Sequence, residues 1–251
     1  MAGRAQRLTP AGDFDYERAG AGYARLRRPD PRLAAHVHAA LGDARTVLNV
    51  GAGAGSYEPQ DRYVAAVEPS AAMRAQRPPQ LAPAIDATAE ALPFDDDSFD
   101  AAMAMITVHQ WSDLERGLTE LRRVARGPVV ILTFDPDAML DFWLADYVPE
   151  VFEAERPRMP KLSALGGEAS ALPIPLDCVD GFIEAYYGRP EAFLDPEIRA
   201  AQSAWEKTGV DIGPGLTRLA EDLRSGAWDA RYGDLRRQPE YIGSLRLITR
   251  R

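Results

Sequence analysis

The most constraining feature of the sequence is a glycine-rich turn that directly follows a short hydrophobic run. The run ends at Val50, and glycines then occupy alternate positions, Gly51, Gly53 and Gly55. Glycine is needed where the backbone adopts positive φ or where a ligand leaves no room for a Cβ atom. A second hydrophobic run ends on Glu68, and an acidic residue about 20 positions after such a turn typically binds a ribose diol. The two runs therefore predict neighbouring strands that bind a nucleoside-containing cofactor.

Five hydrophobic runs alternate with helical or turn segments, which is the pattern of a parallel sheet covered by helices on both faces. The runs are Thr46–Val50, Val64–Glu68, Ala82–Ala87, Phe99–Ile106 and Val129–Phe134. We interpret residues 172–176 and 241–249 as two further strands of the same sheet. The expected fold class is therefore α/β, with a Rossmann-like, seven-stranded, mostly parallel sheet, helices on both faces and a helical cap.

The chain divides into four predicted regions. Residues 1–41 form N-terminal helices, and residues 42–135 form the cofactor-binding core. Residues 136–240 form a helical cap and substrate region that includes the sixth strand near 172–176, and residues 241–251 supply the final strand of the core sheet. We expect the cap to cover the carboxyl edge of the sheet.

Composition excludes several classes of partner. The net charge is −9, from 38 acidic and 29 basic residues, which disfavours nucleic acid because its binding relies on neutralising phosphates. No apolar run is long enough for a membrane span, and the polar N-terminus does not resemble a secretory signal, so we expect a cytoplasmic protein. The single cysteine, Cys178, offers neither an internal disulfide nor a cysteine cluster for a metal, and we predict no metal site.

The glycine spacing discriminates between cofactors. A dinucleotide-binding turn reads G-x-G-x-x-G, whereas here the third glycine, Gly55, comes one residue early. Glu58 also follows closely, and a carboxylate is unfavourable beside a pyrophosphate. The pattern instead suits a cofactor without phosphates that carries a sulfonium and an amino-acid tail.

The sequence resembles a known family, the class I S-adenosylmethionine-dependent methyltransferases. The resemblance covers residues 13–135 and rests on four segments: Val47–Gly55, Glu68–Ser70, Ala89–Phe94 with Asp97–Asp100, and His109–Trp111. Ala91–Phe94 with Ser98–Asp100 is typical of the small-molecule branch similar to the ubiquinone and menaquinone C-methyltransferases. The resemblance implies S-adenosyl-L-methionine as cofactor and in-line methyl transfer to a small-molecule acceptor. The alternative is an S-adenosylmethionine-binding protein of the same fold without methyl transfer, in a regulatory or cyclisation-type role.

The resemblance also implies roles for individual residues. Gly51, Ala52 and Gly53 should line the methionine part of the cofactor, and Glu68 should accept hydrogen bonds from both ribose hydroxyls. The remaining cofactor-binding candidates are Asn49 near the amino group, Ser70 and Met73 beyond the second strand, Thr88 and Ala89 at the adenine, and Tyr23 and Arg28 on an N-terminal lid. Asn49 stands where most relatives have Asp or Glu, and Thr88 replaces the commoner Asp. Met73 is equally compatible with core packing, and Tyr23 and Arg28 with a helix surface.

Two features concern the acceptor. His109 is the candidate catalytic residue, because a histidine can take a proton near neutral pH; a structural role with Trp111 packed beneath it is the alternative. The segment Asp177–Tyr187 is dense in acids and aromatics, which suits either the wall of a small-ligand pocket or a cap helix packed on the sheet. The acceptor itself and the oligomeric state stay open.

Overall fold

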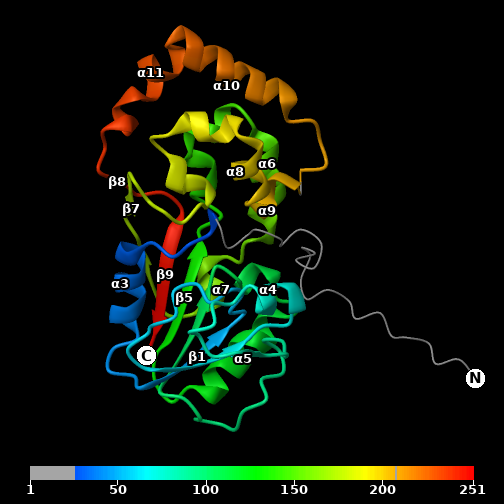
Figure 1. Ribbon diagram of the computed structural model, residues 1–251, viewed down its shortest axis with the longest axis vertical. Helices are drawn as coiled ribbons and strands as arrows, with labels where there is room; N and C mark the ends of the chain where they lie inside the picture. Colours follow the sequence, from blue (N-terminus) through cyan, green and yellow to red (C-terminus); the bar gives the residue numbers. More distant parts are fainter. Residues whose placement is uncertain (1–25, 207) are drawn as a thin grey trace, which may run out of the picture.

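The computed structural model describes residues 26–206 and 208–251 and has an α/β core with a helical cap (Figure 1). The sheet has seven strands in the order β3-β2-β1-β4-β5-β9-β6. Their bounds are β1 Thr46–Val50, β2 Tyr63–Val67, β3 Ala84–Ile85, β4 Ala101–Met105, β5 Val129–Phe134, β6 Glu168–Ala171 and β9 Leu245–Arg250. The first five strands run parallel, and β9 is antiparallel to both β5 and β6. The predicted seven-stranded, mostly parallel sheet is confirmed.

Alternation along the strands builds a hydrophobic core on each face of the sheet. In β1, Val47 packs in one core and Leu48 in the other, because successive side chains of a strand point to opposite faces. Helix α3 (Pro31–Ala40) covers the first face through Leu33 and Val37, and α5 (Leu114–Val124) covers the second. None of the helices in the described ranges combines the length and apolar character that a membrane crossing requires.

The predicted sixth strand at 172–176 is wrong in position. The strand that pairs with β9 is β6, whose four residues are all exposed at the sheet edge. Residues 174–175 instead form β7, which pairs with β8 (Glu240–Tyr241) in a separate two-stranded sheet. A hydrophobic pattern indicates which residues are buried, not which strands pair. It therefore led to the buried Leu172 and Ile174 and gave no signal for the exposed edge strand. The predicted terminal strand from Tyr241 is likewise divided into β8 and β9.

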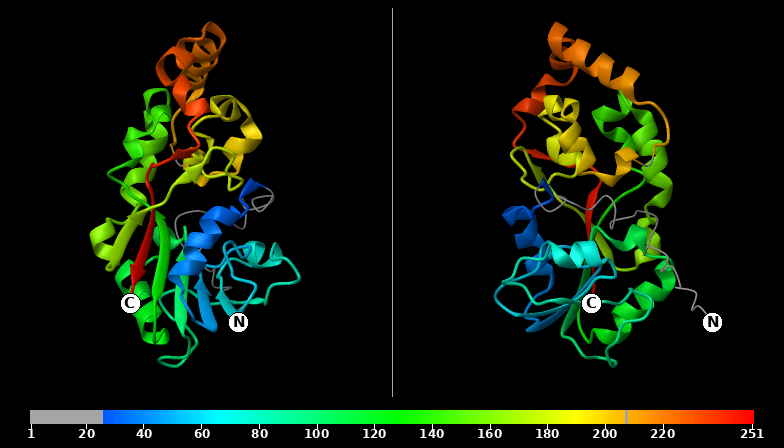
Figure 2. Two further views of the ribbon diagram at one scale, coloured as in Figure 1. Left: turned by 90° about the vertical axis from the view of Figure 1, so that its left-hand side faces the viewer. Right: turned by 45° about the vertical axis from the view of Figure 1, so that its right-hand side comes forward.

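The cap covers the carboxyl ends of the parallel strands and consists of short helices (Figures 1 and 2). Its elements are η2 Met139–Asp141, η3 Trp143–Asp146, α6 Pro149–Glu155, η4 Arg156–Arg158, η5 Ile183–Tyr186, η6 Pro190–Leu194, α8 Pro196–Ala200, α9 Ser203–Glu206, α10 Gly213–Ser225, α11 Ala227–Tyr232 and η7 Gly233–Arg236. The other described helices are α4 Ala71–Ala75, η1 Val108–Gln110 and α7 Leu162–Leu165. Aromatic side chains hold the cap together, with the ring of Trp143 5.2 Å from that of Trp228 and 5.7 Å from that of Phe193.

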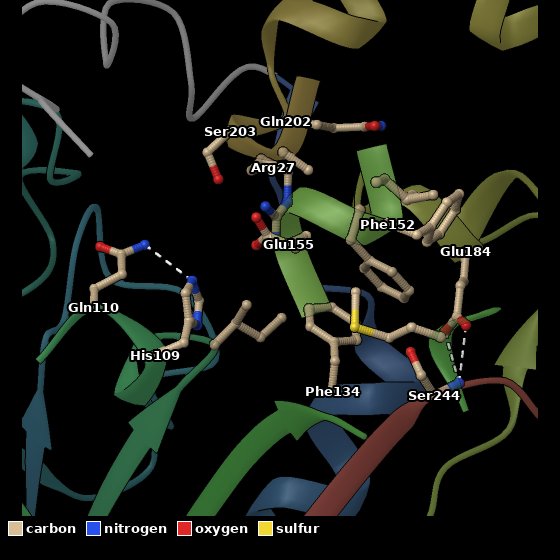
Figure 3. A pocket seen from close by; sticks show the side chains of 15 residues that line it. Arg27, His109, Gln110, Phe134, Phe152, Glu155, Glu184, Gln202, Ser203 and Ser244 are labelled. Atoms are coloured by element: carbon tan, nitrogen blue, oxygen red, sulfur yellow. Dashed lines mark hydrogen bonds between the residues drawn. The ribbon is translucent and has the colours of Figure 1, made fainter. Parts of the chain in front are cut away.

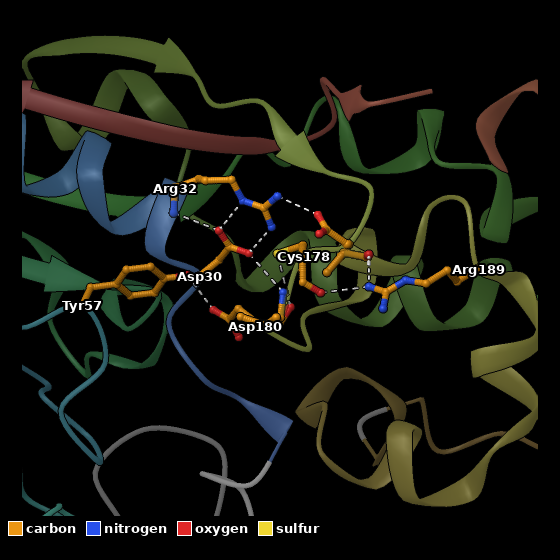
Figure 4. Close-up of polar contacts among 9 residues, drawn as sticks. Asp30, Arg32, Tyr57, Cys178, Asp180 and Arg189 are labelled. Atoms are coloured by element: carbon orange, nitrogen blue, oxygen red, sulfur yellow. Dashed lines mark hydrogen bonds and ion pairs between the residues drawn. The ribbon is translucent and has the colours of Figure 1, made fainter. Parts of the chain in front are cut away.

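Buried polar contacts fix the cap to the core. The Tyr57 hydroxyl donates to Asp180 at 2.7 Å, and Arg27 forms an ion pair with the same carboxylate at 2.7 Å. Figure 4 shows Asp180 beside a second carboxylate, Asp30, which accepts from the backbone N–H of Val179. The loop that precedes η5 is therefore held by the segment before α3 and by the glycine-rich turn.

Glu184, in η5, makes a further contact between cap and sheet. Both of its carboxylate oxygens lie 2.9 Å from the backbone nitrogen of Ser244, which donates to them directly before β9. The side chain is 4% exposed, and this burial raises the pKa of Glu184 to about 7. The contact positions the start of β9, yet it keeps an acid in a largely apolar environment.

Replacing Glu184 with glutamine is expected to raise the free energy of unfolding at and above neutral pH. The carboxyl has an ordinary pKa of 4.5 and a folded-state pKa of about 7, so between these values the folded protein binds a proton that the unfolded chain has lost. The free energy of unfolding therefore falls as pH rises through this window. Glu184→Gln removes this dependence and keeps an acceptor for Ser244, so its advantage should grow to roughly 2–3 kcal/mol above pH 7.

Urea unfolding of both proteins across this pH window measures the difference. Glu153, an exposed residue of α6, supplies the control, since Glu153→Gln should keep the pH dependence of the wild-type protein. Stability curves of wild type and Glu184→Gln that run parallel with pH would contradict the predicted cost of burial.

Candidate active site

The glycine-rich turn joins the carboxyl ends of three strands. Gly51, Gly53 and Gly55 all have positive φ, at 68°, 51° and 97°. The N–H groups of Gly51 and Ala52 both donate to the carbonyl of Val67, at the end of β2, at 2.9 Å. A Cβ atom on Gly51 would lie 2.2 Å from Oγ1 of Thr107, just beyond β4. Only glycine therefore fits this position.

Glu68 closes the other side of the turn. One carboxylate oxygen accepts from the N–H of Gly53 and the other from the N–H of Ser70, each at 2.8 Å. Burial raises the pKa of Glu68, and the two backbone donors oppose that shift. A carboxylate has about four lone-pair sites, so these contacts orient Glu68 and leave it able to accept from a diol.

Ser70 and Met73 belong to the start of α4, next to the glycine-rich turn. The Ser70 hydroxyl is the N-cap of α4 and accepts from the N–H of Met73 at 3.2 Å. Met73 is buried, with its methyl group 3.3 Å from the position of a Cβ on Gly53. Thr88 and Ala89 lie in the loop after β3, where Ala89 is buried and Thr88 exposed.

Asn49 belongs to a buried polar cluster beside the turn. Its Nδ2 donates to Glu58 at 3.0 Å. Glu58 also forms a bidentate ion pair with Arg77, with both contacts at 3.0 Å. Because the Glu58 carboxylate can only accept, the amide of Asn49 must present its nitrogen there. Its Oδ1 is left buried without a hydrogen-bond partner. An orphaned acceptor of this kind fits an ammonium group such as that of an amino-acid tail.

The structure places Arg27, not Arg28, inside the molecule. Arg28 is exposed, whereas Arg27 lines the cavity described below and is paired with Asp180. The backbones of Arg27 and Asp180 also pair in a single antiparallel β-bridge. In such extended backbone, successive side chains point in opposite directions. The predicted contact between Arg28 and the cofactor stays a prediction, and Arg27 is the residue of this pair whose side chain lines the cavity. Tyr23 lies outside the described residues.

An apolar cavity lies between the sheet edge and the cap. Figure 3 shows His109 and Gln110 on one side, Glu184 and Ser244 on the other, and Phe134 between them. The space between its lining residues, including the part open to solvent, is about 620 Å³, and Phe152 of α6 contributes to its wall. Nε2 of His109 lies 3.3 Å from Nε2 of Gln110.

Residues 106–109 connect the glycine-rich turn with this cavity. Ile106 lines the cavity and has φ +52°, a strained conformation for a β-branched residue. Thr107 packs against Gly51, and His109 again lines the cavity. A ligand in the turn and a ligand in the cavity would thus meet at the end of β4.

The sequence pattern predicts candidate residues on the core side of the site and few on the cap side. Glu155, Gln202, Ser203 and Ser244 reach the cavity from segments far apart in sequence, and no local spacing marks them. The density of acids and aromatics in Asp177–Tyr187 was the available signal, since Phe182, Ile183 and Glu184 do line the cavity. Within the described ranges, no group of three or more His, Cys, Asp or Glu residues could hold a metal ion.

Comparisons with known proteins agree with this geometry. The methyltransferase-domain family matches residues 48–132. The structure of a proposed methyltransferase from an antibiotic biosynthesis pathway of Anabaena variabilis is 31% identical, covers 90% of this chain and 99% of its own, and has a TM-score of 0.81. A proposed type II methyltransferase from Anaeromyxobacter dehalogenans, 22% identical with a TM-score of 0.52 over 89% of this chain and 96% of its own, shares the fold.

A search of the curated proteins found no significant match. The Anabaena variabilis protein, however, is similar over nearly its whole length and includes the cap as well as the core. Together with the domain match, this similarity settles the family. The chain belongs to the class I S-adenosylmethionine-dependent methyltransferases.

Proposed function

We propose that the protein transfers the methyl group of S-adenosylmethionine to a small-molecule acceptor held in the cavity between sheet and cap. One observation carries the proposal: Thr107 packs on Gly51 of the turn, and its neighbours Ile106 and His109 line the cavity. A methyl group delivered at the end of β4 would therefore face the cavity. The Anabaena variabilis relative, which is described as a methyltransferase from an antibiotic biosynthesis pathway, also supports a small molecule as acceptor.

The turn and its surroundings suit the cofactor residue by residue. Gly51, Ala52 and Gly53 offer backbone without bulky side chains to the methionine part, and Asn49 Oδ1 offers an acceptor to its amino group. Glu68 is oriented to accept from the ribose hydroxyls. Ser70, Met73, Thr88 and Ala89 would form the adenine side. Arg27 replaces Arg28 as the basic residue of the N-terminal segment that reaches the site.

The lining of the cavity favours a small, apolar acceptor. Phe134, Phe152 and Phe182 supply aromatic walls, and clefts lined by aromatic side chains with a few polar groups are typical of small-ligand sites. The motifs Ala91–Phe94 and Ser98–Asp100 support a place in the small-molecule branch similar to the quinone C-methyltransferases. A net charge of −9 disfavours a nucleic-acid acceptor.

The protein would accelerate transfer chiefly by alignment. S-adenosylmethionine supplies a methyl group already activated by its sulfonium, and the acceptor's nucleophile displaces the sulfur in line. The cavity walls hold the acceptor against the end of β4 and exclude water, and such orientation can supply on the order of 7–11 kcal/mol. For a hydroxyl or activated carbon, His109 is placed to accept the proton that the nucleophile loses.

A labelled-methyl assay tests the proposed function. Incubation with S-adenosylmethionine and a collection of small apolar alcohols, phenols and amines should give S-adenosylhomocysteine and a labelled small molecule. Label found only in added protein or RNA would contradict a small-molecule acceptor.

Glu68→Ala is expected to weaken binding of S-adenosylhomocysteine. The ribose hydroxyls would lose their charged acceptor, which costs roughly 1–3 kcal/mol, or up to about a hundredfold in Kd. Isothermal titration calorimetry measures the change. Glu120 of α5 also accepts from a backbone N–H, that of Leu92, so Glu120→Ala is the control and should keep wild-type affinity. Equal affinity of Glu68→Ala and wild type would place the ribose elsewhere.

Gly51→Ala is expected to abolish tight cofactor binding, because the new methyl group would collide with Thr107. Gly42 provides a matched control: it also has positive φ, 58°, but no atom lies within 4 Å of its Cβ position. Gly42→Ala should therefore show only the backbone strain, roughly 1 kcal/mol of stability, with unchanged affinity for S-adenosylhomocysteine. Calorimetry and thermal unfolding of both variants separate the two effects, and matched affinities would contradict the close approach at Gly51.

His109→Asn is expected to lower kcat by roughly a hundredfold for a hydroxyl acceptor, the usual effect of losing a general base. The affinity for S-adenosylhomocysteine should stay that of the wild type, because His109 lines the cavity and not the turn. Ser203→Ala, at another polar position of the cavity lining, is the control and should keep wild-type turnover. Turnover of His109→Asn within a few-fold of wild type would assign His109 a structural role.

A further inference from the structure

The cavity contains an acid whose charge no basic residue balances. Glu184 lines the cavity and is 4% exposed, and its hydrogen-bond donors belong to Ser244 and Leu245 at the start of β9. Among the described residues, no arginine, lysine or histidine forms an ion pair with it. Arg246, whose charge lowers the pKa of Glu184, is itself paired with Asp135 at 3.1 Å. A buried charge without a partner is costly, so a ligand that supplies a donor would be favoured here.

The other charged residues of the cavity are already compensated. Arg27 is paired with Asp180 at 2.7 Å, and Glu155 is paired with Arg158. Each of these charges thus has an oppositely charged partner, whereas no ion pair of Glu184 is seen among the described residues. The pKa of Glu184, raised by burial to about 7, means that the carboxylate forms near neutral pH, and a bound donor would favour that charged form further.

Geometry separates this acid from the transfer chemistry. His109, in η1 after β4, lies on one side of the cavity, whereas Glu184 lies on the other, with the apolar side chains of Phe134 and Phe152 between them (Figure 3). A molecule that spans the cavity would place its body against these rings. Its two ends would then meet different chemistry, the methyl donor at one and a carboxylate at the other.

We propose that the methyl acceptor is an apolar, neutral or cationic molecule that donates a hydrogen bond to Glu184 from the end opposite the methylated atom. The donor is a hydroxyl or an amine, and an anionic group at that end is rejected by repulsion from the carboxylate. This inference rests on the proposed function for the identity of the cavity as the acceptor site. Glu184 is thus a specificity-determining residue.

Four matched probes test the proposal: phenethylamine, phenethyl alcohol, ethylbenzene and hydrocinnamate. They share a phenyl ring and a short chain and differ in the end group, which is a cation, a neutral donor, apolar or an anion. Calorimetry with the full chain saturated with S-adenosylhomocysteine should rank the amine and the alcohol above ethylbenzene, and hydrocinnamate last. The amine should exceed hydrocinnamate by at least about tenfold in Kd.

Glu184→Gln should remove this ranking, with the amine losing about tenfold and hydrocinnamate gaining. A loss for the amine alone identifies a cationic donor, and a loss for amine and alcohol together identifies a donor irrespective of charge; both results support the proposal. Glu153→Gln is the control, because Glu153 is an exposed acid of α6 that does not line the cavity, and it should keep the wild-type ranking. If Glu153→Gln changes the ranking as much as Glu184→Gln does, the assignment to Glu184 is overturned.

The wild-type ranking alone also tests the proposal, should either variant fail to fold. Equal binding of amine and hydrocinnamate, or no binding of any probe, would overturn it. Binding of S-adenosylhomocysteine is measured first in the same cell. Its absence would count against the proposed function, whereas its presence with unselective probe binding would count against the role of Glu184 only.

Discussion

The close approach of Gly51 and Thr107 is the contact on which the organisation of this protein depends. A methyl group at residue 51 would overlap the threonine hydroxyl, so the turn after β1 and the end of β4 can meet only because Cβ is absent. This contact brings the glycine-rich turn to the segment from which Ile106 and His109 enter the cavity. Ile106, directly before Thr107, has positive φ, so the backbone beside this contact is itself in a conformation that a β-branched residue rarely adopts.

The elements predicted from sequence are those whose signals are local. Buried parallel strands are continuous hydrophobic runs, so Thr46–Val50 and Val129–Phe134 were predicted with the bounds that the structure shows. The glycines of the turn and Glu68 also lie within a short stretch of chain, so their spacing can be read from the sequence. The exposed edge strand β6 has no hydrophobic signal, and its pairing with β9 depends on residues that are distant in sequence. Tertiary pairing, not propensity, decides such a strand.

The same distinction explains which site residues escaped prediction. Arg27 and Arg28 are equivalent in sequence, and only the bridge to Asp180 determines that Arg27 points inward. Glu184 lies in a segment whose composition suggested a ligand wall, yet its importance comes from what it lacks, a basic partner within the described residues. Whether a buried acid has a basic partner depends on which side chains of the core, the loop after β7 and the cap lie beside it in the folded protein. The sequence alone does not show this.

The cofactor turn and the acceptor cavity are not independent modules. Tyr57, two residues beyond Gly55 and itself at positive φ, donates to Asp180, and Asp180 also holds Arg27 in the cavity wall. Gly181 follows directly and donates to the carbonyl of Leu26, which fixes the loop that leads to Phe182 and Glu184. A backbone change in the turn would therefore act on the cavity through Asp180. Since Asp180 is buried, its two partners are needed to offset the cost of its charge, and this requirement couples the positions of turn, N-terminal segment and cap.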